Sequence, residues 1–198
     1  MVNEVLIEET AVNQHYNLDI IKYKIMLYLA VFSFFLAMLG VYYVIDFVNI
    51  KGVNVFLTIL FNLIPTFIFI IIGILLLKLK NRFCVDYDYI FVSGSLRIAK
   101  VINNKNRKPI LKFNCSCIEK IGPIDSKLYN SYLNNLSVKT EFMTSNENPA
   151  EGKHFYYIVI NLNSQKQMIV LESTRNFIIN VFKFSNMNVR DEELKWSI

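Results

Sequence analysis

Seven basic side chains lie close together near the middle of the chain, and side chains of this type bind anionic ligands. They are Arg97, Lys100, Lys105, Arg107, Lys108, Lys112 and Lys120, and Glu119 is the one acid among them. The whole 198-residue chain carries a formal net charge of only +5, so this excess is local. Basic groups near an anionic surface contribute about 1 kcal/mol each, over a Debye length of roughly 8 Å. The first six, here called the basic patch, either face anionic headgroups or form a solvated loop that keeps a sheet edge soluble.

Other kinds of reactive site find little support in the residue types. A nucleic-acid site needs aromatic platforms or a groove-reading helix, and neither accompanies the basic patch. Cys115 and Cys117 are spaced C-x-C without a second ligand pair, so we expect two alternating strand residues there rather than a zinc site. His15 and His154 have no nucleophile or acid beside them in the sequence, and no hydrolase, phosphate-loop or dinucleotide motif is present. We expect no enzymatic activity, no cofactor and no metal.

Asp86 and Asp88 are spaced so that both carboxylates fall on one face of a strand. A carboxylate pair of this kind can act together in acid–base chemistry. The interpretation that we favour is a solvent-facing pair that meets Arg97 or Lys100 across a hairpin.

Hydrophobic residues make up 54% of the whole chain. Two long apolar segments dominate its first half. Residues 23–45 contain a single charge, Lys24, and residues 54–77 contain none. At about 1.5 Å of rise per residue, each is long enough to cross a hydrocarbon core of roughly 30 Å. We predict two transmembrane helices, since the first segment is too long for a signal peptide and lacks its cleavage site.

The flanking charges predict the orientation of this hairpin. Lys22 and Lys24 precede the first span, and Lys78, Lys80 and Arg82 follow the second. The loop between the spans holds Lys51 alone, so the positive-inside rule places both termini in the cytoplasm of a plasma membrane. Three cysteines on that side make a disulfide framework improbable.

Three residues interrupt the apolar character of the spans. Ser33 lies in the first, and Asn62 and Pro65 lie in the middle of the second. Proline frees a backbone carbonyl, and an amide in lipid needs a hydrogen-bond partner. We predict that Ser33, Asn62 and Pro65 take part in helix packing, within the hairpin or in a homo-oligomer.

Residues 84–185 follow a β-strand pattern, which a helical pattern closes. Alternating residues after Cys84, followed by the Ser93-Gly94 pair, predict a hairpin. Residues 103–108 are expected to form a basic loop, and later segments are expected to form five further strands. Ser173 or Thr174 can cap a helix with apolar residues at helical spacing. Residues 1–22 are expected to form a short amphipathic helix or a loose tail, and residues 186–198 a polar tail with Trp196 as its one large anchor.

Two spans followed by seven strands and a helix resemble the bacterial pleckstrin-homology-like domains that often follow paired membrane helices. The stretch VDYDYIFVSGSLRIAKVINNKNRK is similar to a pattern in a family of small two-span proteins of anaerobic Gram-positive bacteria. Its features here are the acidic-aromatic arm from Asp86 to Phe91, Gly94, Leu96 with Ile98, and the basic cluster from Lys105 to Lys108. The resemblance implies a membrane helical hairpin with a mainly-β, seven-stranded PH-like barrel, and it implies no reaction.

Two functional hypotheses follow. The first is a non-enzymatic module, anchored at the cytoplasmic face, that binds a protein partner or anionic lipid headgroups and assembles with copies of itself through open strand edges. The second is an accessory subunit of a membrane transport or secretion complex, which uses Asn62 and the spans as its binding face. Nucleic acid is not an expected partner.

Overall fold

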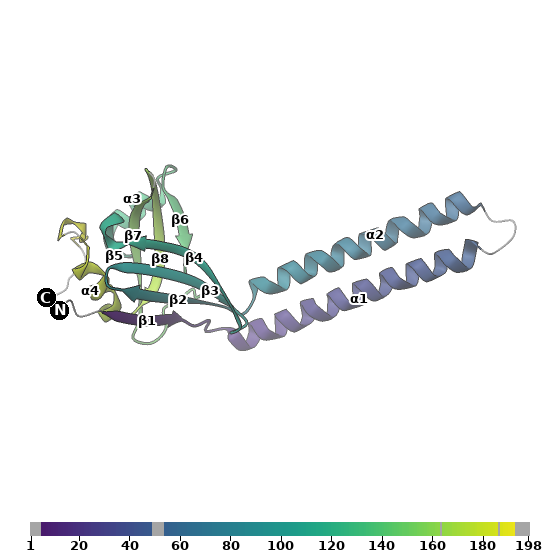
Figure 1. The fold of residues 1–198 in the computed structure, drawn as a ribbon, viewed down its shortest axis with the longest axis horizontal. Helices are drawn as coiled ribbons and strands as arrows, with labels where there is room; N and C mark the ends of the chain where they lie inside the picture. The colour runs from purple at the N-terminus through teal and green to yellow at the C-terminus, as the bar shows by residue number, and fades with distance from the viewer. Residues whose placement is uncertain (1–4, 49–53, 163, 186, 193–198) are drawn as a thin grey trace. The chain divides into compact units, whose positions relative to one another are not determined.

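The computed structural model describes all residues except 1–4, 49–53, 163, 186 and 193–198, and it divides the chain into two compact units (Figure 1). One unit is helical and comprises residues 16–84. The other is mainly β and combines residues 1–15 with residues 85–198. The β-unit is therefore discontinuous in sequence.

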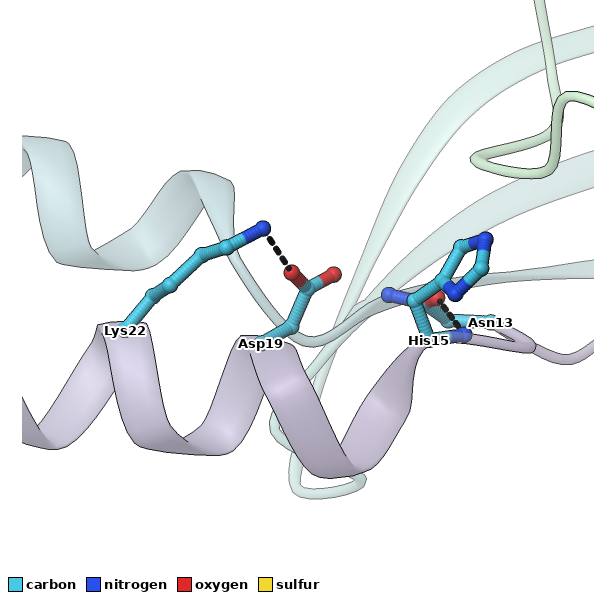
Figure 2. A network of polar contacts seen from close by, with 4 residues as sticks. All are labelled: Asn13, His15, Asp19 and Lys22. Carbon is cyan, nitrogen blue, oxygen red and sulfur yellow. Dashed lines mark hydrogen bonds and ion pairs between the residues drawn. The ribbon is translucent and has the colours of Figure 1, made fainter.

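The helical unit is a hairpin of two long helices, α1 (Tyr16–Val48) and α2 (Val55–Leu79), followed by the short helix η1 (Lys80–Arg82). The Asn54 side chain caps α2 by accepting a hydrogen bond from the Leu57 amide at 3.4 Å. Near the start of α1, Lys22 Nζ lies 3.0 Å from Asp19 Oδ1 (Figure 2). The pair is one helical turn apart, so it supports the first turns of the helix.

Small residues line the contact between the two helices. Ala30, Ser33 and Ala37 are buried on α1, at a spacing that places them on one face. Ser33 Oγ donates a hydrogen bond to the Phe69 carbonyl of α2 at 2.8 Å. A Cβ atom on Gly73 would come within 2.8 Å of the Phe34 ring, so glycine lets that ring lie against the α2 backbone. Close approach through small residues and a side-chain hydrogen bond is typical of membrane helix pairs.

Pro65 is placed differently from Ser33. Pro65 is exposed on α2, so its ring is not part of the contact between the helices of this chain. Asn62 belongs to α2, and its side chain lies outside the described residues.

Both helices are long and apolar enough to cross a membrane. Within the described residues the qualifying segments are Tyr16–Tyr43 and Leu63–Arg82. Only 17% and 11% of their most apolar windows are buried. The core helix of a soluble protein would instead be mostly covered by other protein, so these helices lack that character.

The β-unit contains two four-stranded sheets within the described residues. The first is antiparallel, with the spatial order β1 (Leu6–Ala11), β2 (Val85–Val92), β3 (Ser95–Ile102) and β4 (Asn106–Asn114). The second has the order β5 (Ile118–Pro123), β7 (His154–Leu162), β8 (Gln165–Ser173) and β6 (Lys139–Phe142), with β6 parallel to β8. The remaining elements are η2 (Cys115–Cys117), α3 (Lys127–Leu133), α4 (Arg175–Lys183) and η3 (Met187–Val189).

Apolar residues of both sheets and of α4 form the main core. Its members include Tyr89 and Leu96 of the first sheet, Ile158 of the second and Phe177 of α4. The second sheet also buries its other face, where Tyr157 packs in a smaller cluster against residues of α3. Burial on both faces explains the unbroken apolar runs at 155–160 in β7 and 168–171 in β8.

Several expectations are confirmed. Ser93 and Gly94 have φ of 41° and 89°, the conformation of a type I′ turn between β2 and β3. Thr174 caps α4 by accepting a hydrogen bond from the Phe177 amide. The apolar helices also occur where the two spans were predicted.

Other expectations are wrong. Residues 6–11 form β1, which pairs with β2, rather than an amphipathic helix or a loose tail. The described strands number eight, in two sheets of four, and a closed seven-stranded barrel is not found among them. The expected basic loop of residues 103–108 is only half loop, because residues 103–105 form a turn and β4 begins at Asn106. Cys115 and Cys117 lie on the turn η2 rather than on a strand.

Candidate functional site

The pairing of β3 with β4 places basic side chains directly opposite one another. Arg97 is the partner of Lys112, and Lys100 is the partner of Lys108. Like charges at such positions are destabilising, because the Cβ atoms of opposed residues lie about 4.5–5.5 Å apart. A β-bulge between Ile98 and Ala99 shifts the register between the two pairs. Both pairs depend on this register, which the sequence alone does not reveal.

The two pairs lie on different faces of the first sheet. Leu96 and Ile98 point into the core, so Arg97 between them points outward, and Lys112 shares its side. We call Arg97 and Lys112 the outer pair.

Lys100, Lys108 and Lys105 form a second set, here called the rim group. Lys100 of β3 pairs with Tyr87 of β2, which packs against the core, so Lys100 and Lys108 point to the core side at one end of the sheet. Lys100 is half-buried and Lys108 is exposed. Lys105 is exposed in the β3–β4 turn. The basic patch is therefore divided between two surfaces.

Arg107 differs from the rest of the basic patch because a carboxylate lies beside it. Its Nε is 3.1 Å from Asp88 Oδ2, and Thr10 Oγ1 donates a hydrogen bond to Asp88 Oδ1 at 2.8 Å. In the described part of the chain, no carboxylate comes within ion-pair distance of the outer pair or the rim group. Five positive charges of the patch therefore remain uncompensated there.

The prediction that Asp86 and Asp88 face solvent and pair with Arg97 or Lys100 is wrong in both parts. Asp86 and Asp88 are only 4% and 6% exposed, and neither is paired with Arg97 or Lys100. Asp86 Oδ1 accepts a hydrogen bond from the Asn13 amide at 2.8 Å. Residues before α1 cover this face, which is why the two carboxylates are buried. They anchor β1 and the segment after it.

A buried carboxylate that the sequence did not reveal organises the loop after β6. Glu172 is fully buried and accepts hydrogen bonds from Thr144 Oγ1 at 2.7 Å, Asn146 Nδ2 at 2.7 Å and the Ala150 amide at 2.9 Å. Asn146 Nδ2 also donates to the Val12 carbonyl at 2.8 Å. Charge-assisted bonds of this kind stabilise a buried carboxylate. Glu172 therefore holds the loop against the segment that follows β1.

The histidines have structural surroundings. The His15 amide donates to Asn13 Oδ1 at 2.8 Å, a turn that closes the segment after β1 (Figure 2). The His154 ring lies edge-on to Tyr156, with 6.3 Å between centroids. Among the described residues, no three His, Cys, Asp or Glu side chains are grouped so that they could hold a metal ion.

The cysteines differ in exposure. Cys115 is buried, and burial raises the pKa of its thiol to about 12. Cys117 is partly exposed. A thiol with a raised pKa stays protonated near neutral pH, so buried Cys115 gives no support for a thiol nucleophile.

A pocket of about 300 Å³ lies on the α3 side of the second sheet, away from the basic patch. Its wall is mainly apolar and aromatic, with three polar residues at one side. It is lined by Ile124, Tyr129, Phe142, Thr144, Asn146, Glu147, Phe155 and Val170. No pattern in the sequence pointed to it, because its residues come from four separate segments.

Comparison with protein families gives a match to a family model described as Bacterial PH-like domain (DUF6106), over residues 3–191. That range includes the helical hairpin as well as both sheets. Comparisons with curated proteins and with solved structures gave no match.

Proposed function

Because the chain belongs to the bacterial PH-like domain family, we propose that it is a membrane-anchored, non-enzymatic binding module whose rim group binds an anionic surface. The hairpin of α1 and α2 is the anchor, and the β-unit is the binding part. The ligand chemistry is that of anionic phospholipid headgroups at the cytoplasmic face of the plasma membrane.

The pairing of β1 with β2 supports a hairpin that crosses twice. β1 precedes α1 and β2 follows α2, yet the two strands are neighbours in one sheet. A chain that crosses a membrane twice between two paired strands has both strands on the same side. Cationic residues flank the two ends of the hairpin that connect to β1 and β2, and by the positive-inside rule they favour a cytoplasmic position for those ends. These residues are Lys22, Lys24, Lys78, Lys80 and Arg82.

The observation that carries the proposal is the Lys100–Lys108 pair. Basic residues on β4 have an ordinary explanation, since β4 is an edge strand and charges protect sheet edges from aggregation. Lys100 lies on β3, which is paired on both sides, so edge protection does not account for it. An anionic ligand between Lys100 and Lys108 would offset a repulsion that the fold otherwise tolerates at a loss of stability.

The position of the rim group along the sheet also fits. Val85 pairs with Ile102, so the β3–β4 turn lies at the end of the sheet where β2 begins. Residues 80–84 alone connect α2 to β2, and a segment of that length reaches at most about 20 Å. The rim group is thus at the end of the sheet that is tethered most closely to the anchor in sequence.

The test uses the full chain held in nanodiscs of neutral lipid and measures co-sedimentation with vesicles of phosphatidylglycerol or phosphatidylcholine. We expect binding to the anionic vesicles alone, weakened by salt. The variant K100E/K105E/K108E should lose it, whereas the matched variant R97E/K112E, which reverses the outer pair, should keep most of it. Equal loss of vesicle binding in both variants would mean that binding depends on total positive charge and not on the rim group. No binding of the wild type to either vesicle would remove the lipid proposal.

A further inference from the structure

The pocket on the α3 side of the second sheet has a floor of paired strands and an aromatic lining. Val170 of β8 and Phe142 of β6 are cross-strand neighbours there, and Phe155 of β7 and Tyr129 of α3 add two further rings. The Tyr129 ring also packs against Tyr157, with 5.8 Å between centroids. The pocket volume of about 300 Å³ is at the lower end of the range for small-molecule sites, roughly 300–1,000 Å³. Its size and lining suit a small molecule with an apolar body.

Hydrogen bonds to a buried carboxylate hold the polar side of the wall. Thr144 Oγ1 donates to Glu172 Oε2 at 2.7 Å and accepts from the Asn146 amide at 3.1 Å. Asn146 Nδ2 uses its two hydrogens for Glu172 Oε2 at 2.7 Å and for the Val12 carbonyl at 2.8 Å. Asn146 is 8% exposed and Glu172 is 0% exposed, so water has little access to these bonds. The side-chain donors of Thr144 and Asn146 are therefore spent within the protein.

The hydrogen-bonding capacity that the wall still offers is mainly that of acceptors. Glu147 lines the pocket and is exposed, and no cationic side chain in the described ranges lies within ion-pair distance of it. An ionised carboxylate accepts hydrogen bonds only. Asn146 Oδ1 accepts from the Gln14 amide at 2.9 Å and has a second lone pair. Apart from the Tyr129 hydroxyl, the lining side chains thus offer a ligand acceptors and a negative charge.

These features define the ligand's charge and shape. A ligand must bring its own N–H donors and a positive charge, and the three donors of a protonated primary amine meet that need. Because Glu147 is exposed, the charged end of the ligand stays near water and avoids the cost of burying a charge. The aromatic rings of the wall attract cations as well as apolar groups. An anionic ligand would instead meet the carboxylate of Glu147 without a compensating cation.

We propose that this pocket binds a small primary amine, protonated near neutral pH. Its ammonium group donates to the Glu147 carboxylate, and its aryl or alkyl body lies among Tyr129, Phe155 and Val170. The site takes a ligand of opposite charge to the anionic surface that the rim group binds, and it does not depend on the rim group.

The experiment is saturation-transfer difference NMR with the full chain in nanodiscs of phosphatidylcholine. Empty discs are measured in parallel, because amines with apolar bodies also enter lipid. The probes are 2-phenylethylamine and hexylamine, and 3-phenylpropanoate is the anionic analogue. We expect a saturable signal above that of empty discs from both amines and none from 3-phenylpropanoate.

Two variants test the assigned contacts. E147Q should weaken binding of both amines roughly tenfold, because it removes a hydrogen bond between two charged groups. F142A should also weaken it by removing part of the aromatic wall. The matched control is E151Q, which removes the same charge from an exposed residue that does not line the pocket, and it should bind like the wild type. Glu147, Phe142 and Glu151 are exposed, so the fold tolerates the changes, and circular dichroism checks it.

Several results would overturn the proposal. They are equal weakening by E147Q and E151Q, binding of 3-phenylpropanoate as strong as that of the amines, and no saturable signal from either amine. A Gly-Lys-Gly peptide with blocked ends that binds where both free amines fail would also overturn it, and would assign the pocket to a lysine side chain of a protein partner. E147Q should leave co-sedimentation with anionic vesicles unchanged, so failure of this site and failure of the rim group are distinguishable.

Discussion

Reversing one charge of the rim group should make the β-unit more stable and its anionic binding weaker. Lys108→Glu turns the Lys100–Lys108 pair from like to opposite charge. Cross-strand charge pairs change stability by roughly 0.2–1 kcal/mol in either direction, so the reversal should gain about 0.4–2 kcal/mol. Coulomb's law in water gives a consistent value, since two unit charges about 6 Å apart interact by roughly 0.7 kcal/mol and the sign reverses. The gain should nearly vanish at about 1 M salt, where the Debye length is about 3 Å.

The assay is urea unfolding of the full chain in neutral nanodiscs, followed by circular dichroism at low and high salt, with vesicle co-sedimentation in parallel. Lys112→Glu is the matched control, because it reverses the outer pair and should gain similar stability without losing anionic binding. A Lys108→Glu variant that is no more stable than the wild type at low salt would refute the repulsion on which the reasoning rests. Higher stability with unchanged vesicle binding would refute the role of the rim group.

Three further changes test other parts of the structure. Gly122→Ala should lower the free energy of unfolding by about 1.5–3 kcal/mol in urea titrations, because the new Cβ would lie 2.6 Å from Asp191 Oδ2 and would break a buried hydrogen bond to a carboxylate. Ser33→Ala should weaken the helix hairpin by about 0.6 kcal/mol, the average for hydrogen bonds between membrane helices, and steric-trapping measurements in bicelles would detect it. In alkylation at pH 8 followed by mass spectrometry, Cys117 should react before Cys115, because burial holds the pKa of Cys115 near 12 and keeps its thiol protonated until the chain unfolds.

Features that depend on nearby residues could be predicted from the sequence. The apolar segments became α1 and α2 because length and hydrophobicity are local properties. The β2–β3 hairpin follows from alternation on both sides of Ser93-Gly94, and α4 follows from Thr174 and its apolar spacing. Each of these elements carries its own signal within about a dozen residues.

Features that depend on distant partners could not be predicted in the same way. β1 is a short segment that contains Glu8 and Glu9, and it becomes a strand because it pairs with β2 far along the chain. The burial of Asp86 requires that same pairing, since its partner is the Asn13 amide. The division of the basic patch depends on a bulge at Ile98 and Ala99, whose register is set by β4. For the candidate site, composition therefore identified the residues and non-local pairing decided which of them act together.

The discontinuity of the β-unit has a consequence for how the protein is made. The segment that becomes β1 leaves the ribosome before either helix, and its partner β2 follows only after both. At about 5–20 residues per second, the residues 12–84 between the two strands delay pairing by about 4–15 s. During that interval β1 is an unpaired strand, and Glu8 and Glu9 are the kind of charged residues that keep such a strand from aggregating. Completion of the first sheet is thus a late event in biogenesis, which cannot precede synthesis of the hairpin between its first two strands.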